Sequence, residues 1–558
     1  MILRRLVEYA DNRMELPPPM YGETPIRWLV DLAPDGSFEG FAPLGGDTKA
    51  SRRGESMLVP TVVRAAGIKP KLLADNGEYV LGIARADTNP EKVEERHRQF
   101  VDLVRLCADQ TREPSVRLVA EFLEAWDEGE YRDLLPEEFD SQDNLTFRVG
   151  GEIPASESPE VQRFWAQSTF GDDAPVMTCL VTGEVGPVEQ RLPVKVKGLT
   201  RIGGQAAGTS LISANASAFE SYGLENSLTS PISRDAGERF GKALNYLLES
   251  ENSRIYAGPL AYVFWTRQKS DFGLDLMAEP DPDRVKNLLA SPYSGSEQSN
   301  VKSNDFYALA LSASGGRAVV RDWLETTVPE AEDHLKRWFR AQGMLSAYGE
   351  EASPLGLYAL AAGAYRDPAK EMTPQVPAAL VRAAIRGSRL PEELLARAVR
   401  RNRAEGDVSR QRAALMKLVL SYTGGTELSE IPKELNQNSE DKAYNCGRLL
   451  AELESLQRSA IPGVKATLVD RFYGSASSAP ASVFGTLMRN HQAHVSKLRK
   501  ERGGAAVAIQ DRISEIMTRI GSDFPKILTL REQARFALGY YHQRAHNRAQ
   551  SRQNREDS

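Results

Sequence analysis

The hydrophobic pattern of the sequence changes near Ser346, and this change limits the folds that the chain can adopt. Before it, short runs rich in β-branched residues, such as 145–151 and 175–185, alternate with helical segments. After it, apolar residues recur at helical spacing, with Gly and Pro between the segments. Strand runs joined by turns are typical of antiparallel sheets, and spacings of three to four residues are typical of amphipathic helices. The sequence therefore predicts an α+β fold: a mixed, mainly antiparallel β-containing N-terminal body followed by an all-α C-terminal helical bundle.

The chain of 558 residues is too long for a single hydrophobic core. We expect four regions, namely an α+β body at 1–230, its α+β continuation at 231–345, a helical linker region at 346–434 and a helical bundle at 435–558. Apolar faces predict four helices in the bundle, and the tail beyond His546, which lacks such a face, is expected to be disordered.

Several classes of protein are disfavoured by composition. No run of about 18 uncharged apolar residues exists, so we expect no membrane segment and a cytoplasmic protein. The three cysteines are scattered, which favours small buried apolar residues over disulfides or a zinc site. The six histidines form no set with metal-ligand spacing, so we expect no metal, no cofactor and no catalytic constellation.

Charge is distributed unevenly along the chain. The net charge is −6, yet residues 435–558 hold 19 Lys and Arg against 12 Asp and Glu, a local balance of +7 that leaves −13 for the remainder. Such asymmetry favours a basic module that touches phosphate on an acidic body that meets proteins, although a solvated helical face is the plainer interpretation. The candidate contacts to a single strand are basic residues near aromatic ones: Lys497, Arg499, Lys500, Arg502, Arg544 and Arg548.

A stretch rich in Gly, Ser and Thr runs from Gly198 to Gly223, after a strand expected at 192–196. It is not a Walker loop, because Thr209 and Ser210 follow Gly208 with no Lys beside them. Two interpretations stay open: exposed backbone donors that bind phosphate, or a buried turn. The candidate phosphate contacts are Arg52, Arg53, Lys195, Lys197, Arg201, Thr209 and Ser210.

A second candidate is the segment before a strand expected at 78–83. Lys69 and Lys71 flank Pro70, and the sequence Asp-Asn-Gly at 75–77 is a strong turn signal. Asn76 carries the paired donor and acceptor that can read a base edge, and Lys reaches phosphate or a purine acceptor. The amides of Gln205 and Asn215 offer similar contacts. An ordinary hairpin turn with two solvated lysines is the alternative.

Three stretches together resemble a known family. They are MILRRLVEYADNRMELPPPMYGETPIRWLVDLAPDGSFEGF at the N-terminus, GGQAAGTSLISANASAFESYG in the glycine-rich stretch, and VDRFYGSASSAPASVF near the C-terminus. The chain resembles the large subunit, of the Csd1 type, of the type I-C CRISPR surveillance complex Cascade, along essentially its whole length.

The resemblance implies a non-enzymatic subunit whose N-terminal body recognises the protospacer-adjacent motif in double-stranded DNA and helps to unwind it. It implies as partners the guide RNA, the target DNA, the backbone and guide-processing subunits of Cascade, and a nuclease-helicase recruited in trans. It further implies that the C-terminal helical region is also made separately as the small subunit. The alternatives are a metal-dependent nuclease and a purely structural scaffold of a ribonucleoprotein.

Overall fold

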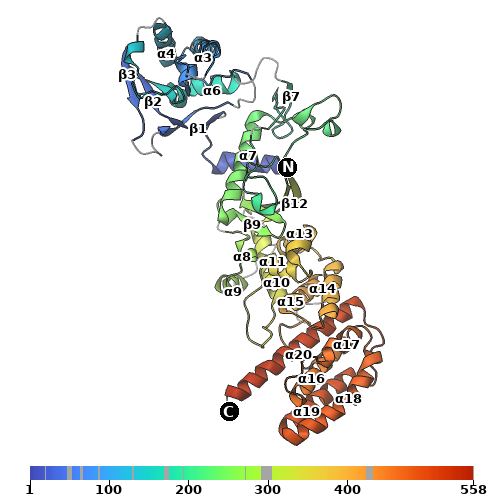
Figure 1. The fold of residues 1–558 in the computed structure, drawn as a ribbon. Coiled ribbons are helices and arrows are strands. Elements are labelled where there is room, and N and C mark those ends of the chain that lie inside the picture. The colour runs from blue at the N-terminus through green and yellow to red at the C-terminus, as the bar shows by residue number, and fades with distance from the viewer. Residues whose placement is uncertain are drawn as a thin grey trace. The chain divides into compact units, whose positions relative to one another are not determined.

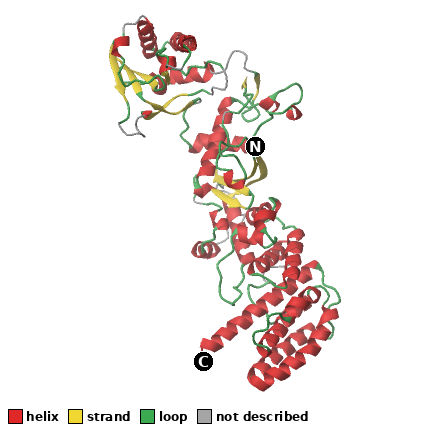
Figure 2. Cartoon of the chain, viewed as in Figure 1, coloured by secondary structure: helices red, strands yellow, loops and turns green. Residues whose placement is uncertain are grey.

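The computed structural model is drawn in Figures 1 and 2. Its chain forms two compact units. The first contains residues Met1–Lys195 and Ile212–Ala243, and the second contains Val196–Leu211 and Leu244–Ser558. The structure describes residues 1–18, 20–46, 53–62, 67–85, 88–127, 131–168, 175–192, 194–270, 272–290, 304–422 and 431–556.

The first unit is built around a four-stranded sheet of order β3-β2-β6-β5. Strands β2 and β6 are parallel, with Trp28 opposite Leu145, and the other pairs are antiparallel. The first unit also contains the two-stranded sheets β1-β4 and β7-β8. The elements are α1 (Ile2–Arg13), β1 (Tyr21–Ile26), β2 (Trp28–Leu32), β3 (Phe38–Pro43), β4 (Glu55–Pro60), β5 (Ala74–Asn76), α2 (Gly77–Val80), α3 (Pro90–Thr111), α4 (Pro114–Asp127), η2 (Arg132–Leu134), β6 (Asn144–Val149), α5 (Pro154–Glu157), α6 (Pro159–Ser168), β7 (Val176–Thr178), β8 (Val185–Pro187), η4 (Ser217–Phe219) and η5 (Asn226–Thr229).

The core of the first unit lies between this sheet and helices α3 and α4. Phe147 of β6 and Phe122 of α4 meet edge to face, with their ring centroids 6.1 Å apart. Trp126 of α4 is 1% exposed and donates its indole N–H to the Leu81 carbonyl. Large aromatic side chains of this kind contribute much of the burial that stabilises a small core.

The second unit combines an antiparallel sheet of order β12-β11-β10-β9 with a long series of helices. Every residue of β10 is buried. The elements are η3 (Thr200–Ile202), η6 (Glu251–Ser253), β9 (Arg254–Ala257), β10 (Leu260–Thr266), α8 (Asp275–Ala278), α9 (Pro282–Ala290), β11 (Asp305–Ser314), β12 (Arg317–Thr327), α10 (Val328–Gln342), α11 (Leu357–Ala362), α12 (Pro368–Glu371), α13 (Gln375–Arg386), α14 (Glu392–Glu405), α15 (Arg410–Tyr422), α16 (Lys442–Ala460), α17 (Leu468–Ala476), α18 (Pro480–Glu501), α19 (Gly503–Ile520) and α20 (Leu530–Glu556), while α7 (Arg234–Glu249) runs from the first unit into the second.

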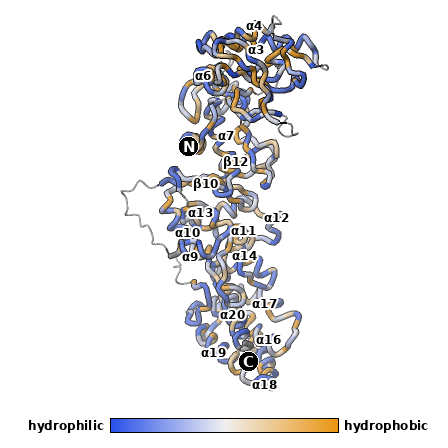
Figure 3. The backbone as a smooth tube through the Cα atoms, turned by 90° about the vertical axis from the view of Figure 1, so that its left-hand side faces the viewer, coloured by the Kyte–Doolittle hydropathy of each residue, from blue (hydrophilic) through white to orange (hydrophobic). Residues whose placement is uncertain are grey.

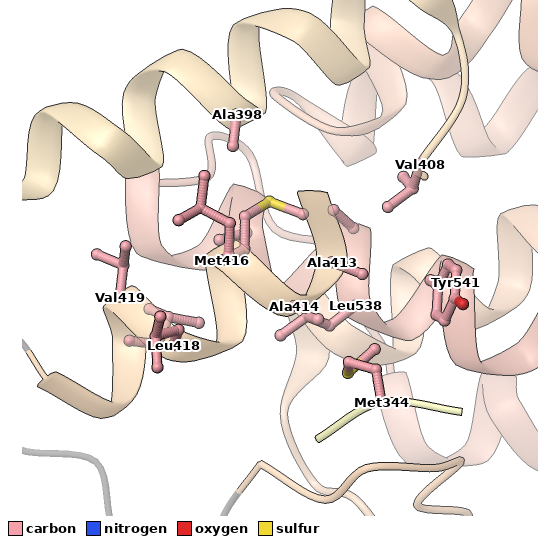
Figure 4. Close-up of a cluster of buried hydrophobic side chains, with 14 of the residues drawn as sticks. Met344, Ala398, Val408, Ala413, Ala414, Met416, Leu418, Val419, Leu538 and Tyr541 are labelled. Carbon is pink, nitrogen blue, oxygen red and sulfur yellow. The ribbon is translucent and has the colours of Figure 1, made fainter. Parts of the chain in front are cut away.

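One hydrophobic core runs through the second unit from Ile255 to Tyr541. Helix α15 is buried on all sides from Arg412 to Tyr422, as expected for a helix without a polar face. Figure 4 shows Met416 and its neighbours on α15 among side chains of α14 and α20. Hydrophobic and hydrophilic residues alternate along the surrounding helices (Figure 3), which is the pattern of amphipathic helices packed on a shared core.

The predicted fold class is confirmed, with antiparallel sheets towards the N-terminus and helices towards the C-terminus. Several local predictions were wrong. Residues 78–83 begin with helix α2 instead of a strand, and the short helix α17 was missed. Among the described residues of the strand predicted at 192–196, only Val196 forms a bridge.

The tail beyond His546 is helical to Glu556, not disordered. Its ordering comes from distant residues: Arg552 pairs with Glu350, and Arg548 donates to the Ala347 carbonyl at 3.3 Å.

Candidate nucleic-acid interface

The segment with Lys69, Lys71 and Asn76 forms a firmly held turn at the edge of the first unit's main sheet. The buried Asp75 accepts the backbone N–H groups of Lys71 and Asn76, both at 2.9 Å. Leu73 adopts a left-handed φ of 55° while fully buried, and its carbonyl accepts the Thr146 hydroxyl at 2.9 Å. A left-handed conformation is unfavourable for Leu, so packing around it must fix the turn.

Helix α2 anchors the end of this turn. Its second residue, Glu78, is buried and accepts hydrogen bonds from Arg85 and Thr88, both at 2.9 Å, and pairs with Arg96 of α3. Burial alone would raise the pKa of Glu78, but these hydrogen bonds and the two guanidinium charges hold it below the ordinary value. The carboxylate is therefore stably ionised and ties α2 to α3.

The three candidate side chains of this turn differ in what they offer a ligand. Lys69 is exposed, while Lys71 and Asn76 are half-buried. Asn76 is the N-cap of α2, and its side-chain oxygen accepts the Tyr79 N–H at 3.3 Å. Its amide N–H₂ group is consequently the part of Asn76 best suited to reading a base, because the oxygen already serves the helix.

The first part of the glycine-rich stretch forms a turn held by backbone hydrogen bonds to its own residues. Within 196–211, the N–H groups of Gly203, Gly204 and Gly208 all donate to carbonyls of the same stretch. Thr209 pairs with Val196, and Ser210 donates its N–H to the Gly316 carbonyl at 2.8 Å. These glycine donors are therefore engaged within the chain, which favours a turn over a phosphate-binding loop. From Gly203 to Ser210 the turn is buried only at Gly208 and Thr209, while Gly203 and residues 205–207 are exposed.

Close approach explains why glycine is needed there. A Cβ at Gly204 would lie 2.9 Å from the Leu199 carbonyl oxygen and from the Thr209 hydroxyl. Gly203 has a φ of 96° and faces the Ala313 carbonyl. Thr209 itself is fully buried, so its placement does not support contact with a phosphate, and the half-buried Ser210 presents its backbone to the β11–β12 turn.

Basic side chains next to this closed turn remain on the surface of the second unit. Lys197, Arg201 and Gln205 are exposed, and the Arg201 guanidinium lies 4.6 Å from the centroid of the Tyr256 ring. Arg254 approaches the same ring at 5.8 Å. A tyrosine flanked by guanidinium groups is suited to a base or phosphate. Tyr256 lies more than 50 residues along the chain from Arg201, so no local motif pointed to it.

The remaining residues predicted to read a base or to bind phosphate are divided between the two units. Lys195 and Asn215 are exposed residues of the first unit, whereas Lys197, Arg201 and Gln205 belong to the second. Arg53 is exposed in the first unit, and Arg52 lies outside the described residues. The sequence order of these residues therefore does not by itself define a single surface.

The C-terminal end of α18 presents a cluster of cations, which we call the α18 cluster: Lys497, Arg499, Lys500 and Arg502. All four are exposed, and no ion pair joins any of them to a carboxylate among the residues that the structure describes. Arg499 donates to the Gln510 side chain at 2.8 Å. Cations also stabilise a helix C-terminus through its dipole, and this local role accounts for part of the pattern.

Arg544 has a different environment. It pairs with Asp407 at 2.5 Å, lies 3.7 Å from Glu454, and donates to the Tyr540 hydroxyl at 3.1 Å. Although desolvation opposes it, the neighbouring tyrosine and carboxylates raise the pKa of Arg544. Its first role is to join α20 to the loop after α14, and a displaced strand would have to compete with these partners.

A family model described as CRISPR-associated protein (Cas_Csd1) matches residues 3–547. The chain belongs to this family. The match covers nearly the whole chain, including both compact units and the α18 cluster. No curated protein matches the sequence significantly.

Other features of this Csd1 family member bear on its chemistry. All three cysteines are buried and free, as predicted from their spacing. Within the described ranges, no three His, Cys, Asp or Glu side chains gather in a way that could hold a metal ion. Over the same residues, no helix combines the length and apolar character needed to cross a membrane.

Proposed function

We propose that this Csd1 family protein is the non-catalytic large subunit of a type I-C Cascade complex in the cytoplasm. In this proposal it recognises a protospacer-adjacent motif in double-stranded DNA, helps to unwind the duplex and stabilises the displaced non-target strand. The guide RNA reads the remaining sequence by base pairing, so the protein needs to read only a short motif and the shape of the duplex.

The family match carries this proposal, and the structure adds two surfaces of suitable chemistry. The held turn with Lys69, Lys71 and Asn76 combines cations with a side-chain amide, which suits a short duplex motif. The α18 cluster presents four exposed cations without carboxylate partners in the described residues, which suits a phosphate backbone of any sequence.

The proposed partners are the guide RNA through its 5′ end, the backbone and guide-processing subunits, and a nuclease-helicase that arrives in trans. A small subunit made from the C-terminal region would contain the bundle α16–α20. Met416 lies buried in the middle of α15 (Figure 4), so a product that started there would lack the first part of that helix.

The deciding experiment compares two duplexes, with and without a short T-rich motif beside the target. Binding is measured for the purified chain alone and for the chain assembled with guide RNA and backbone subunits. Motif-dependent binding in the assembly supports the proposal. Equal binding of both duplexes leaves a sequence-independent clamp or scaffold, and DNA cleavage by the chain alone with Mg²⁺ would replace the proposal with a nuclease.

A further inference from the structure

A pocket of about 590 Å³ lies between α16, α20 and the turn that follows α10. This volume is within the range of about 300–1,000 Å³ that is common for small-molecule sites. We call it the α16–α20 pocket. Its charged and aromatic lining residues are Tyr348, Glu454, Arg458, Arg544, Arg548 and Arg552, with serines and Asn547 between them.

Carboxylates neutralise three of the four arginines. Glu454, whose side chain is 5% exposed, holds Arg458 at 2.8 Å. Arg544 pairs with Asp407, and Arg552 pairs with Glu350. These contacts orient the guanidinium groups and leave each with further N–H donors, since a guanidinium carries five.

Arg548 has no carboxylate in ion-pair range among the described residues. Its contacts are a hydrogen bond to the Ala347 carbonyl and the ring of Tyr348, whose centroid lies 5.6 Å away. Burial first, and the charge of Arg544 next, lower the pKa of Arg548. With Asp407 and Glu350 counted beside the lining residue Glu454, the four arginines face three carboxylates, so one positive charge is left over and a single negative charge would balance it.

The turn at 346–349 is shaped to bring an aromatic ring to this cation. Gly349 has a φ of 79°, and a Cβ there would lie 2.7 Å from that of Ala549 on α20. Glycine thus allows the turn to lie directly against α20. Tyr348 remains 54% exposed, so much of its surface is open to a ligand.

We propose that the α16–α20 pocket seats one nucleotide of a single strand, with its phosphodiester at Arg548 and its base against Tyr348. One phosphodiester carries the single negative charge that the lining lacks, and an exposed tyrosine is a stacking platform for any base. The inference rests on the proposed function, because it assigns a binding site for the displaced strand.

The test uses the full-length chain and a fluorescein-labelled 12-nucleotide deoxythymidine strand, with anisotropy as the measure of binding. A second strand carrying 5-iododeoxyuridine is photocrosslinked, and the modified residue is located by mass spectrometry. We expect a crosslink at Tyr348. Tyr348→Ala and Arg548→Gln should each weaken binding about tenfold, whereas Tyr348→Phe should retain near wild-type affinity.

Matched controls come from the same unit. Tyr358 on α11 is 48% exposed, and Arg403 on α14 is exposed, so Tyr358→Ala and Arg403→Gln remove the same chemistry elsewhere. Both should change affinity by less than twofold. Thermal unfolding of each variant shows whether a loss of binding comes from a loss of folding.

Competitors identify the ligand. Displacement of the labelled strand by thymidine monophosphate would show that the pocket also accepts a free nucleotide. Displacement only by an unlabelled strand would show that the pocket needs the continuous backbone. Both results support a nucleotide site. Equal displacement by polyglutamate would overturn it in favour of a general anion surface. Unchanged affinity in Tyr348→Ala and Arg548→Gln, with no crosslink at Tyr348, would also overturn it.

The result of the pocket experiment can be distinguished from the result of the experiment that tests the proposed function. The crosslink is read on the chain without guide RNA, whereas motif recognition is read on the assembled complex. A crosslink at Tyr348 without motif-dependent duplex binding would keep the pocket and remove the large-subunit role.

Discussion

Substitution of Asn76 separates a structural role from a role in reading DNA. Asn76 caps α2 through its side-chain oxygen, which accepts the Tyr79 N–H at 3.3 Å. Alanine removes both this cap and the amide N–H₂ group. Serine keeps a capping oxygen but lacks the amide donor, so the pair Asn76→Ala and Asn76→Ser distinguishes the two functions.

The expected magnitudes follow from these contacts. Loss of an N-cap costs about 1 kcal/mol, which for a unit of this size lowers the unfolding temperature by about 2–4 °C. A paired contact to a base edge contributes about 1–3 kcal/mol, but the Asn76 oxygen is already engaged. One donor remains, so we expect a loss of about 1 kcal/mol in motif-dependent binding, close to fivefold.

Two measurements check this reasoning: thermal unfolding of the isolated chain, and motif-dependent DNA binding by the assembled complex. Asn76→Ser should unfold like the wild type and bind the motif about fivefold more weakly, while Asn76→Ala should show both losses. If Asn76→Ser binds the motif as tightly as the wild type, Asn76 is only a cap. If Asn76→Ser unfolds at the lower temperature of Asn76→Ala, the capping argument is wrong.

Three further predictions concern the C-terminal helices. Charge reversal of Lys497 and Lys500 should weaken single-strand binding and reduce the slope of log affinity against log salt by about 1.4, measured by salt titration; an unchanged slope would exclude phosphate contact by these lysines. Arg544→Gln should instead destabilise the chain by about 1–3 kcal/mol, measured by denaturant unfolding, because it leaves the buried Glu454 with fewer partners. Burial lowers the pKa of His542 to about 3, so the unfolded chain binds an extra proton between pH 6.5 and 3 and stability falls as pH falls through this window. His542→Gln should make the pH dependence of unfolding shallower there, and an unaltered curve would mean that His542 titrates normally.

Periodicity predicted the architecture well where one face of an element is buried. Helices α3 and α4 and most of the helices after Ser346 have apolar residues at helical spacing, and Asp35 and Gly36, a pair typical of tight turns, join the hairpin β2–β3. These features depend on neighbours within a few residues. A single sequence carries that information directly.

The errors arose where distant residues decide the local structure. The tail beyond His546 has no apolar face, but Arg548 and Arg552 bind residues near position 350, about 200 positions earlier. Asn76 and Gly77 were expected in a turn before a strand. The Glu78 carboxylate instead binds Arg85 and Arg96, and these partners favour a helix that packs on α3.

The glycine-rich stretch illustrates a different limit. Its composition permits close backbone approach but does not say what approaches. Between Val196 and Ser210 the partner is the chain itself, through the turn that joins β11 and β12. The basic and aromatic side chains that surround this turn, among them Arg201 and Tyr256, then define the exposed chemistry.

Net charge locates a nucleic-acid surface only after internal ion pairs are removed from the count. Residues 435–558 carry an excess of +7, but several of their arginines face carboxylates of the same unit, as Arg512 faces the buried Glu452 and Arg535 faces Asp441. Such pairs are largely neutral to a strand and are already ordered. The cations of the α18 cluster have no carboxylate partner in the described chain, so a strand gains their full attraction without breaking a pair. The same reasoning selects Arg548 within the α16–α20 pocket. It predicts that substitutions of arginines paired with carboxylates mainly lower the free energy of unfolding, whereas substitutions of cations without a carboxylate partner in the described residues mainly lower the affinity for a strand.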